Sequence, residues 1–455
     1  MGFVLSILYL VTSYLTPATV FGPLAAVHVE IILAVLVTLV SLPALSKSII
    51  LKTPQSLALI GLSLAMFMSV LVAIRWPGGA VQTLLQFIPS AFAYYLVCLH
   101  CNSKRKLQFL VLMLLFVCLF VIANGYIELL NNEPASASPQ AVAMSSHYTL
   151  AMKNDAHELF YRIKGLGEID DPNDFAQLIV CVIPLTFFFW RPKKIFWNIA
   201  FVLLPVCALL YGVYLTHSRG ALLALMAMAV VAGRRRIGTI PSVLLAGGLF
   251  AGAMALNFTG GRDISTASGA DRTDLWSESM ELLKANPLFG IGNGSLPDYI
   301  GHTAHNSVAV CAAELGLFGL YFWSLFLFPT LRAALEVASP AKVSEGEPMV
   351  AEEGRFPQTT QKIEAIDKAD INHLGRLVVL SFTGYLVTGW FLSRAFAMTL
   401  FLLGGIAEVV YEMALQRGMI APRLRLARAL YYAGAFTISL VLLMYVMLRT
   451  LNLMR

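Results

Sequence analysis

Charged residues are scarce in this sequence. Asp, Glu, Lys and Arg make up 13% of its 455 residues, whereas hydrophobic residues make up 58%. A typical soluble domain has about 25% charged residues. The shortage of charge excludes an ordinary soluble protein and predicts a chain that crosses a membrane several times.

Acidic residues are absent from five short connections between apolar segments. Together these connections hold fifteen Lys and Arg and no Asp or Glu: residues 46–54, 101–107, 191–194, 233–238 and 416–428. Basic residues concentrated in short loops place those loops in the cytoplasm. The net charge of +6 therefore reflects membrane topology, and nucleic acid is not an expected partner.

Cysteine is also rare, with six residues in the chain. Cys98 and Cys101 form a single CxxC without the second pair that a zinc site needs. The sequence also has no Asp-x-Asp or His/Asp cluster with metal-ligand spacing on the face opposite the basic loops. We therefore expect reduced, structural cysteines, no metal site and no other cofactor.

Long apolar segments, by contrast, are abundant. A helix needs about 20 mostly apolar residues to span the hydrocarbon of a bilayer. Thirteen segments approach this length: residues 4–21, 24–43, 56–74, 80–99, 107–124, 174–190, 195–215, 220–232, 239–258, 304–330, 376–392, 396–415 and 429–448. Some are short or interrupted by proline, so we predict an all-α, polytopic integral membrane protein with 12–13 transmembrane helices. We expect residues 1–455 to form a single membrane domain.

Three longer connections are polar. Residues 125–172 and 259–303 carry more acidic than basic residues and fall on the face opposite the basic loops. In a multi-pass protein of the bacterial inner membrane this face is the periplasm, and long loops of this kind tend to carry function. Residues 331–373 are predicted to be a loosely ordered cytoplasmic linker.

Arginines on the predicted periplasmic face run against the positive-inside bias: Arg75, Arg162, Arg219, Arg262, Arg272 and Arg394. Arg219 lies in YLTHSRGALLALMAM, where only a few polar residues separate two apolar helices. A charge at that depth is costly unless it is paired or lines a wet cavity. An arginine at a helix end also snorkels to lipid phosphates. Both interpretations fit Arg219 taken alone.

Arg272 lies in the second predicted periplasmic loop, in SGADRTDLWSESMELLKANPLFGIGNGS. Helical spacing places four residues on one face, with acidic residues on the other: Arg272, Leu275, Trp276 and Ser279. Asn286 and Pro287 end this helix, and three glycines follow in a flexible turn. An amphipathic surface helix explains the pattern equally well. The glycine-rich turn is a weak indicator of phosphate binding, since no Walker lysine follows it.

His305 opens the apolar segment HNSVAVCAAELGLFG. Taken alone, it fits an interfacial histidine. Helical spacing, however, gives this segment a small-residue face suited to close helix packing: Ala309, Ala312, Ala313, Gly316 and Gly319. That face would hold His305 against neighbouring helices. Glu314 falls on the opposite side, where we expect a buried polar partner that the sequence does not identify.

These elements together resemble the O-antigen ligase family. HNSVAVCAAELGLFG is similar to the family signature of His-Asn, nine residues, Gly, two residues, Gly, with His305, Asn306, Gly316 and Gly319 in those positions. THSRGA resembles the family's Ser-Arg-Gly element, and DRTDLW followed by NPLFGIGNG resembles its large periplasmic loop. The elements occur in the family's order across residues 214–319. Upstream, GEIDDPNDFAQLIVCVIPL resembles a Pro-Asn-containing helix entry common in the O-antigen ligase/polymerase superfamily.

The resemblance implies a membrane glycosyltransferase. Its donor would be a glycan linked through diphosphate to undecaprenol, and its acceptor a hydroxyl of lipid A-core or a similar glycolipid at the periplasmic face. His305 would be the general base, and Arg219 and Arg272 would stabilise the departing diphosphate without a metal. Further candidates for substrate binding are His217, Ser218, His302, Asn306 and Arg394.

Three interpretations remain at this point. We favour an O-antigen ligase-type enzyme that moves the whole glycan to its acceptor. A polymerase of repeat units or a protein O-oligosaccharyltransferase of the same superfamily is the alternative. A lipid-glycan transporter is the third, and it would be favoured by inverted repeats, which we do not find in the sequence.

Overall fold

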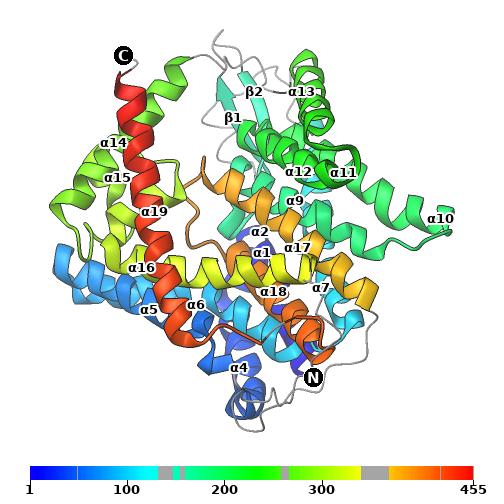
Figure 1. Ribbon diagram of the computed structural model, residues 1–455, viewed down its shortest axis with the longest axis horizontal. Coiled ribbons are helices and arrows are strands. Elements are labelled where there is room, and N and C mark those ends of the chain that lie inside the picture. Colours follow the sequence, from blue (N-terminus) through cyan, green and yellow to red (C-terminus); the bar gives the residue numbers. More distant parts are fainter. Residues whose placement is uncertain are drawn as a thin grey trace, which may run out of the picture. The chain divides into compact units, whose positions relative to one another are not determined.

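The computed structural model of the protein describes residues 1–48, 50–131, 147–153, 159–256, 258, 266–339, 368–420 and 422–453. Helices make up most of this part of the chain (Figure 1), and its one sheet is a two-stranded hairpin. The prediction of an all-α, polytopic membrane protein is confirmed.

Each of the thirteen predicted segments coincides with a helix, but fewer of these helices have the length of a span. In the described part of the chain, nine helices are long and apolar enough to cross a membrane. Gly2–Leu15 and Thr239–Ala255 are apolar but shorter. Arg219–Ile237 and Lys368–Gly389 include charged residues. By length and composition the count is therefore lower than the predicted 12–13.

The chain divides into two compact units. Unit 1 comprises Met1–Ser41, Ser103–Ile264 and Leu377–Thr388, and unit 2 comprises Leu42–Asn102, Ser265–Arg376 and Gly389–Arg455. Both units are therefore assembled from segments that are far apart in the sequence. That residues 1–455 form one membrane domain stays a prediction.

Unit 1 contains the N-terminal helices, the first long connection and the helices on either side of residue 218. Its helices are α1 (Gly2–Leu15), α2 (Pro17–Val20), α3 (Gly22–Val27), most of α4 (Val29–Lys47), α7 (Lys104–Asn131), α9 (Pro172–Thr186), α10 (Ile195–Asn198), α11 (Leu204–Thr216), α12 (Arg219–Ile237), α13 (Thr239–Ala255) and the C-terminal half of α17 (Lys368–Gly389).

Helix α9 lies in the core of unit 1. Its first turn has Pro172 at the first helical position and Asp171 as the cap, whose side chain accepts the N–H of Asn173 at 2.7 Å. Farther along, Gln177 Nε2 donates to Thr388 Oγ1 at 2.9 Å, and Ser381 Oγ donates to Cys181 O at 2.8 Å. These buried bonds join α9 to the C-terminal half of α17.

The first long connection contains a β-hairpin that the sequence did not indicate. Strands β1 (Thr149–Lys153) and β2 (Leu159–Ile163) pair antiparallel, with Leu150 opposite Arg162. Residues 132–146 and 154–158 of the predicted 125–172 loop lie outside the described residues.

Unit 2 is built around α16. Its helices are α5 (Pro54–Ser69), α6 (Pro77–His100), α14 (Thr266–Ala285), α15 (Leu296–Ile300), α16 (Ser307–Ala338), α18 (Met398–Gln416) and α19 (Leu426–Leu453). Helix α16 contacts α5, α14, α18 and α19, and α6 packs on α18; Figure 1 shows α19, in red, running past α14 and α16. The edge-to-face rings of Tyr94, Phe326 and Phe401 fill the space between α6, α16 and α18.

Of the predicted linker at 331–373, residues 331–338 belong to α16. Residues 340–367 lie outside the described residues, and α17 begins at Lys368. In the 259–303 connection, residues 259–265 likewise lie outside the described part, and most of the remainder is helical.

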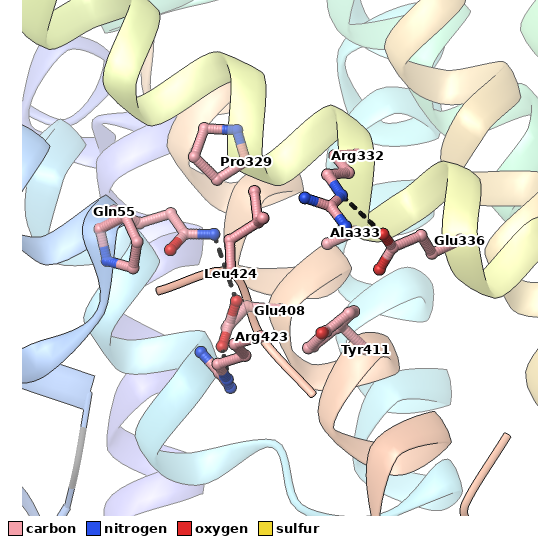
Figure 2. A pocket seen from close by; sticks show the side chains of 10 residues that line it. Gln55, Pro329, Arg332, Ala333, Glu336, Glu408, Tyr411, Arg423 and Leu424 are labelled. Carbon is pink, nitrogen blue, oxygen red and sulfur yellow. Dashed lines mark hydrogen bonds and ion pairs between the residues drawn. The ribbon is translucent and has the colours of Figure 1, made fainter. Parts of the chain in front are cut away.

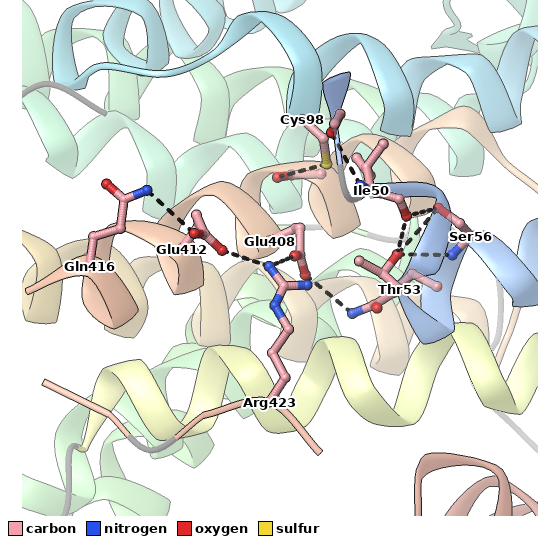
Figure 3. Close-up of polar contacts among 11 residues, drawn as sticks. Ile50, Thr53, Ser56, Cys98, Glu408, Glu412, Gln416 and Arg423 are labelled. Atoms are coloured by element: carbon pink, nitrogen blue, oxygen red, sulfur yellow. Dashed lines mark hydrogen bonds and ion pairs between the residues drawn. The ribbon is translucent and has the colours of Figure 1, made fainter. Parts of the chain in front are cut away.

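A charged cluster joins α18 to the segment that precedes α19. The guanidinium of Arg423 lies between the carboxylates of Glu408 and Glu412 (Figure 3). Its Nη2 is 2.7 Å from Glu412 Oε2. Gln55 Nε2 also donates to Glu408 Oε2 at 3.4 Å. Figure 2 shows a pocket beside it, lined also by the Arg332–Glu336 ion pair of α16. Burial lowers the pKa of Arg423, but the two carboxylates raise it by more, so its pKa lies above the ordinary value. Arg423 is one of the basic residues that predicted a cytoplasmic loop, and it also forms tertiary ion pairs with α18.

Replacing Arg423 with alanine is expected to destabilise unit 2. The Glu408 and Glu412 side chains are each 8% exposed, and removing their shared cation leaves buried carboxylates uncompensated, which costs about 3–5 kcal/mol. The measurement is thermal unfolding in detergent. Arg425→Ala is the control, since Arg425 is exposed and surface changes usually stay within about 0.5 kcal/mol. Equal melting temperatures for the two variants would contradict a stabilising role for the cluster.

Candidate functional site

Asn306 caps the N-terminus of α16. Its side-chain Oδ1 accepts the N–H groups of Val308 and Ala309 at 2.9 and 3.0 Å, an arrangement that typically contributes about 1 kcal/mol. The residue is fully buried. Its Nδ2 has no hydrogen-bond partner among the described residues, so a buried donor is left over beside the start of the helix.

His305 stands immediately before this cap. Its side chain is exposed, and its φ of 49° is a left-handed conformation that non-glycine residues adopt rarely. The backbone N–H of His305 donates to Ser393 Oγ at 2.9 Å. The hydrogen bond of the His305 backbone N–H and the Asn306 cap fix the chain at this point, and the His305 imidazole lies outside α16.

The connection between α17 and α18 lies against the start of α16. Ser307 Oγ donates to Leu392 O at 2.7 Å and accepts the N–H of Arg394 at 3.1 Å. Trp323 Nε1, farther along α16, donates to Ala395 O at 2.8 Å. These bonds place the backbone of Arg394 beside the residues that follow His305, which the sequence could not indicate across almost ninety intervening positions.

Helix α14 is attached to the same place through Trp276. Its Nε1 donates to Ala304 O at 2.7 Å, and its ring makes an edge contact with Trp390, with 6.2 Å between centroids. Arg272 lies one helical turn before Trp276. As predicted, Trp276 and Ser279 face inward, whereas the acidic Asp274 and Glu278 are exposed.

The glycine-rich turn that follows α14 crosses α16 at a break in the helix. Gly316 has a φ of 66°, and a Cβ added there would come within 2.4 Å of Leu288 O. The N–H groups of Ile291 and Gly292 donate to Ala313 O and Glu314 O, at 3.0 and 3.1 Å. At the break in α16, the carbonyl groups of Ala313 and Glu314 therefore accept hydrogen bonds from the glycine-rich turn.

The same turn supplies the partner of Glu314. The carboxylate accepts the N–H of Gly294 at 2.9 Å and that of Leu296 at 3.4 Å. Because these amides bond to α16, the turn serves to pack unit 2 and its N–H groups are not available to a phosphate. The small-residue face predicted for this helix is buried, as expected.

In unit 1, the THSRG segment forms a tight turn between α11 and α12. Helix α11 ends at Thr216, His217 adopts a φ of 48°, and Arg219 is the first residue of α12. His217 Nδ1 lies 2.8 Å from Phe258 O. Ser218 is buried and Arg219 is half-buried.

The predicted site residues are thus divided between the units. In unit 2, α14, the start of α16 and the α17–α18 connection are joined by the hydrogen bonds described above, and we call this place the junction. These three elements carry Arg272, His305, Asn306 and Arg394, and His302 is exposed in the turn after α15. Unit 1 holds His217, Ser218 and Arg219. The meeting of Arg219 with the unit 2 residues stays a prediction. Of the other predicted periplasmic arginines, Arg75 is exposed and Arg262 lies outside the described residues.

Ser307, Ser393 and Trp276 belong to the junction but were not singled out as site residues from the sequence. Each acts through hydrogen bonds to residues distant in the chain, so no local pattern marks it. Among the described residues, no three His, Cys, Asp or Glu side chains gather as metal ligands. Metal independence stays a prediction.

Residues 204–324 match the family model described as O-antigen ligase. Neither a curated protein nor a solved structure matches the chain. The matched segment includes Arg219, Arg272, His305 and Asn306, whereas Arg394 lies outside it.

Proposed function

We propose that the protein is a membrane glycosyltransferase of the O-antigen ligase/polymerase superfamily, which transfers a glycan from undecaprenyl diphosphate to an acceptor hydroxyl. The match of residues 204–324 to the family model described as O-antigen ligase supports this proposal. The acceptor is lipid A-core or a similar glycolipid, and the reaction takes place at the periplasmic face of the bacterial inner membrane. The multi-pass helical fold suits a donor that stays in the bilayer.

The observation that carries this proposal is the junction in unit 2. Hydrogen bonds from Trp276, Ser307 and the His305 backbone hold α14, α16 and the α17–α18 connection together. The junction therefore gathers an exposed histidine and two elements that each carry an arginine. The partial positive charge at the N-terminus of α16 also favours an anion at this place.

The proposed reaction needs a base and a stabilised leaving group. The acceptor oxygen bonds to the anomeric carbon, the bond from that carbon to the diphosphate oxygen breaks, and the hydroxyl proton passes to neutral His305. The departing diphosphate gains negative charge. Arg272 and Arg219 donate to it as planar, two-pronged cations, with Arg394, Asn306, His217, Ser218 and His302 as further contacts to the substrates.

The test is in vitro transfer with purified protein, an undecaprenyl-diphosphate-linked glycan and a lipid A-core acceptor. A product in which the glycan is attached to the acceptor supports the proposal. Elongated glycan still attached to undecaprenyl diphosphate indicates a polymerase, and glycan on a protein acceptor indicates a protein O-oligosaccharyltransferase. Donor that crosses the membrane without reacting indicates a transporter.

Transfer is expected to survive chelation. In this mechanism arginines supply the positive charge that many phosphoryl-binding enzymes take from a metal ion. Protein treated with EDTA and then freed of it should therefore transfer glycan at the untreated rate. Loss of transfer that one divalent ion restores would reject the account in which arginines alone stabilise the leaving group.

A further inference from the structure

Arg162 is a buried cation in unit 1 that the proposed reaction does not use. The residue is 3% exposed and lies on strand β2. Its Nε donates to Thr216 O at 2.6 Å and its Nη2 donates to Asn173 Oδ1 at 2.8 Å. One guanidinium thereby connects the hairpin, the first turn of α9 and the last residue of α11.

The bond to Thr216 falls at the beginning of the THSRG turn. The last carbonyls of a helix lack partners within the helix, and a cation at that end is favoured by the helix dipole. Only His217 and Ser218 separate Thr216 from Arg219, which begins α12. Because only two residues connect them, a displacement of the Thr216 carbonyl would also move Arg219.

The same strand also contacts His217. Phe160 lies two positions before Arg162, on the same face of β2, and its ring packs edge-on against the His217 imidazole with 5.7 Å between centroids. The imidazole is held on another side by Phe258 O. Strand β2 therefore contacts two successive residues of the turn, through an arginine and an aromatic ring.

We propose that Arg162 is a positioning residue, which sets the orientation of Arg219 toward the lipid diphosphate by holding the Thr216 end of the THSRG turn. This inference rests on the proposed function, in which Arg219 binds the diphosphate. It assigns a role to the hairpin of the first long connection, which lies outside the segment matched by the family model.

The test compares Arg162→Lys with Arg191→Lys. A lysine at position 162 keeps the charge but cannot bond to Thr216 and Asn173 with the geometry of the fork. Arg191 stacks on Trp197, 3.8 Å from the ring centroid, in one of the short basic connections of the same unit. We expect Arg162→Lys to raise the KM for the lipid-linked donor about tenfold, the scale of one charge-assisted hydrogen bond. The acceptor KM should stay unchanged, and Arg191→Lys should match wild type.

Two further measurements separate positioning from a merely structural role. In the Arg219→Ala background, Arg162→Lys should raise the donor KM no further, because the two residues act in one chain of contacts. Amide hydrogen exchange at residues 217–220 should be faster in Arg162→Lys than in wild type or Arg191→Lys. A general loss of stability would instead lower the active fraction and leave the donor KM unchanged.

The outcomes for the inference and for the proposed function are distinct. If Arg219→Ala raises the donor KM but Arg162→Lys leaves it unchanged, or if the two effects simply add, the positioning role is overturned and the proposed function stands. If wild-type protein transfers no glycan, or Arg219→Ala leaves the donor KM unchanged, the proposed role of Arg219 falls and this inference falls with it.

Discussion

His305→Ala protein is expected to transfer glycan about 10²–10⁴-fold more slowly than wild type, the usual cost of losing a general base. Its affinity for undecaprenyl diphosphate should stay close to that of wild type, since the base acts on the acceptor proton. The His305 side chain is exposed and its backbone is bonded through its N–H, so the substitution should leave the fold intact. The measurements are in vitro transfer, donor binding and thermal stability.

His147→Ala is the matched control for this experiment. His147 is also exposed and also bonds through its backbone N–H, to Glu128 Oε1 at 2.9 Å, but it is not part of the proposed site. Its alanine variant should transfer glycan at the wild-type rate. Folded His305→Ala protein that transfers at a near-normal rate would show that His305 is only an interfacial histidine.

Arg272→Ala and Arg219→Ala are each expected to weaken donor binding as well as slow transfer. Each removes a cation from the diphosphate, and a hydrogen bond to a charged group contributes about 1.5–3 kcal/mol, or roughly 10- to 100-fold in affinity. Lysine at either position should restore activity only in part, because it returns the charge without the planar fork. Binding of undecaprenyl diphosphate and single-turnover transfer measure the two effects separately.

Lys284→Ala provides the control on the same helix as Arg272. Lys284 is exposed and forms an ion pair with Glu281, 2.9 Å from Nζ to Oε1, in the last turn of α14 and about three helical turns after Arg272. Its loss should leave donor affinity unchanged. Wild-type donor affinity in the folded Arg272→Ala protein would remove Arg272 from the diphosphate site, and the same result for Arg219 would remove that residue.

Local sequence was sufficient to predict much of this protein. Every predicted apolar segment is a helix, because an apolar run of this length in lipid can satisfy its backbone only as a helix. The inward face of α14 followed from the spacing of Trp276 and Ser279, and the packed small-residue face of α16 from its alanines and glycines. Asn306, which the sequence marked only through the His-Asn signature, caps its own helix.

The remaining differences between the predictions and the structure also have physical reasons. Among the described residues, nine helices are long and apolar enough to span a membrane, fewer than the 12–13 predicted, because α1 and α13 are short and α12 and α17 include charged residues. The hairpin was missed because its two strands are five residues each and lie in a polar connection.

The sequence by itself determined the helices, their inward faces and the residues that resemble a glycosyltransferase site, since these depend on neighbours within a few positions. Only the tertiary structure decided what those residues contact. Glu314 meets the glycine-rich turn, Arg394 reaches the start of α16, and Arg162 bonds to Thr216. Each contact joins segments that are 18 to 87 positions apart in the sequence. Whether such a contact forms depends on how whole helices and strands pack, and no local pattern of residues contains that information.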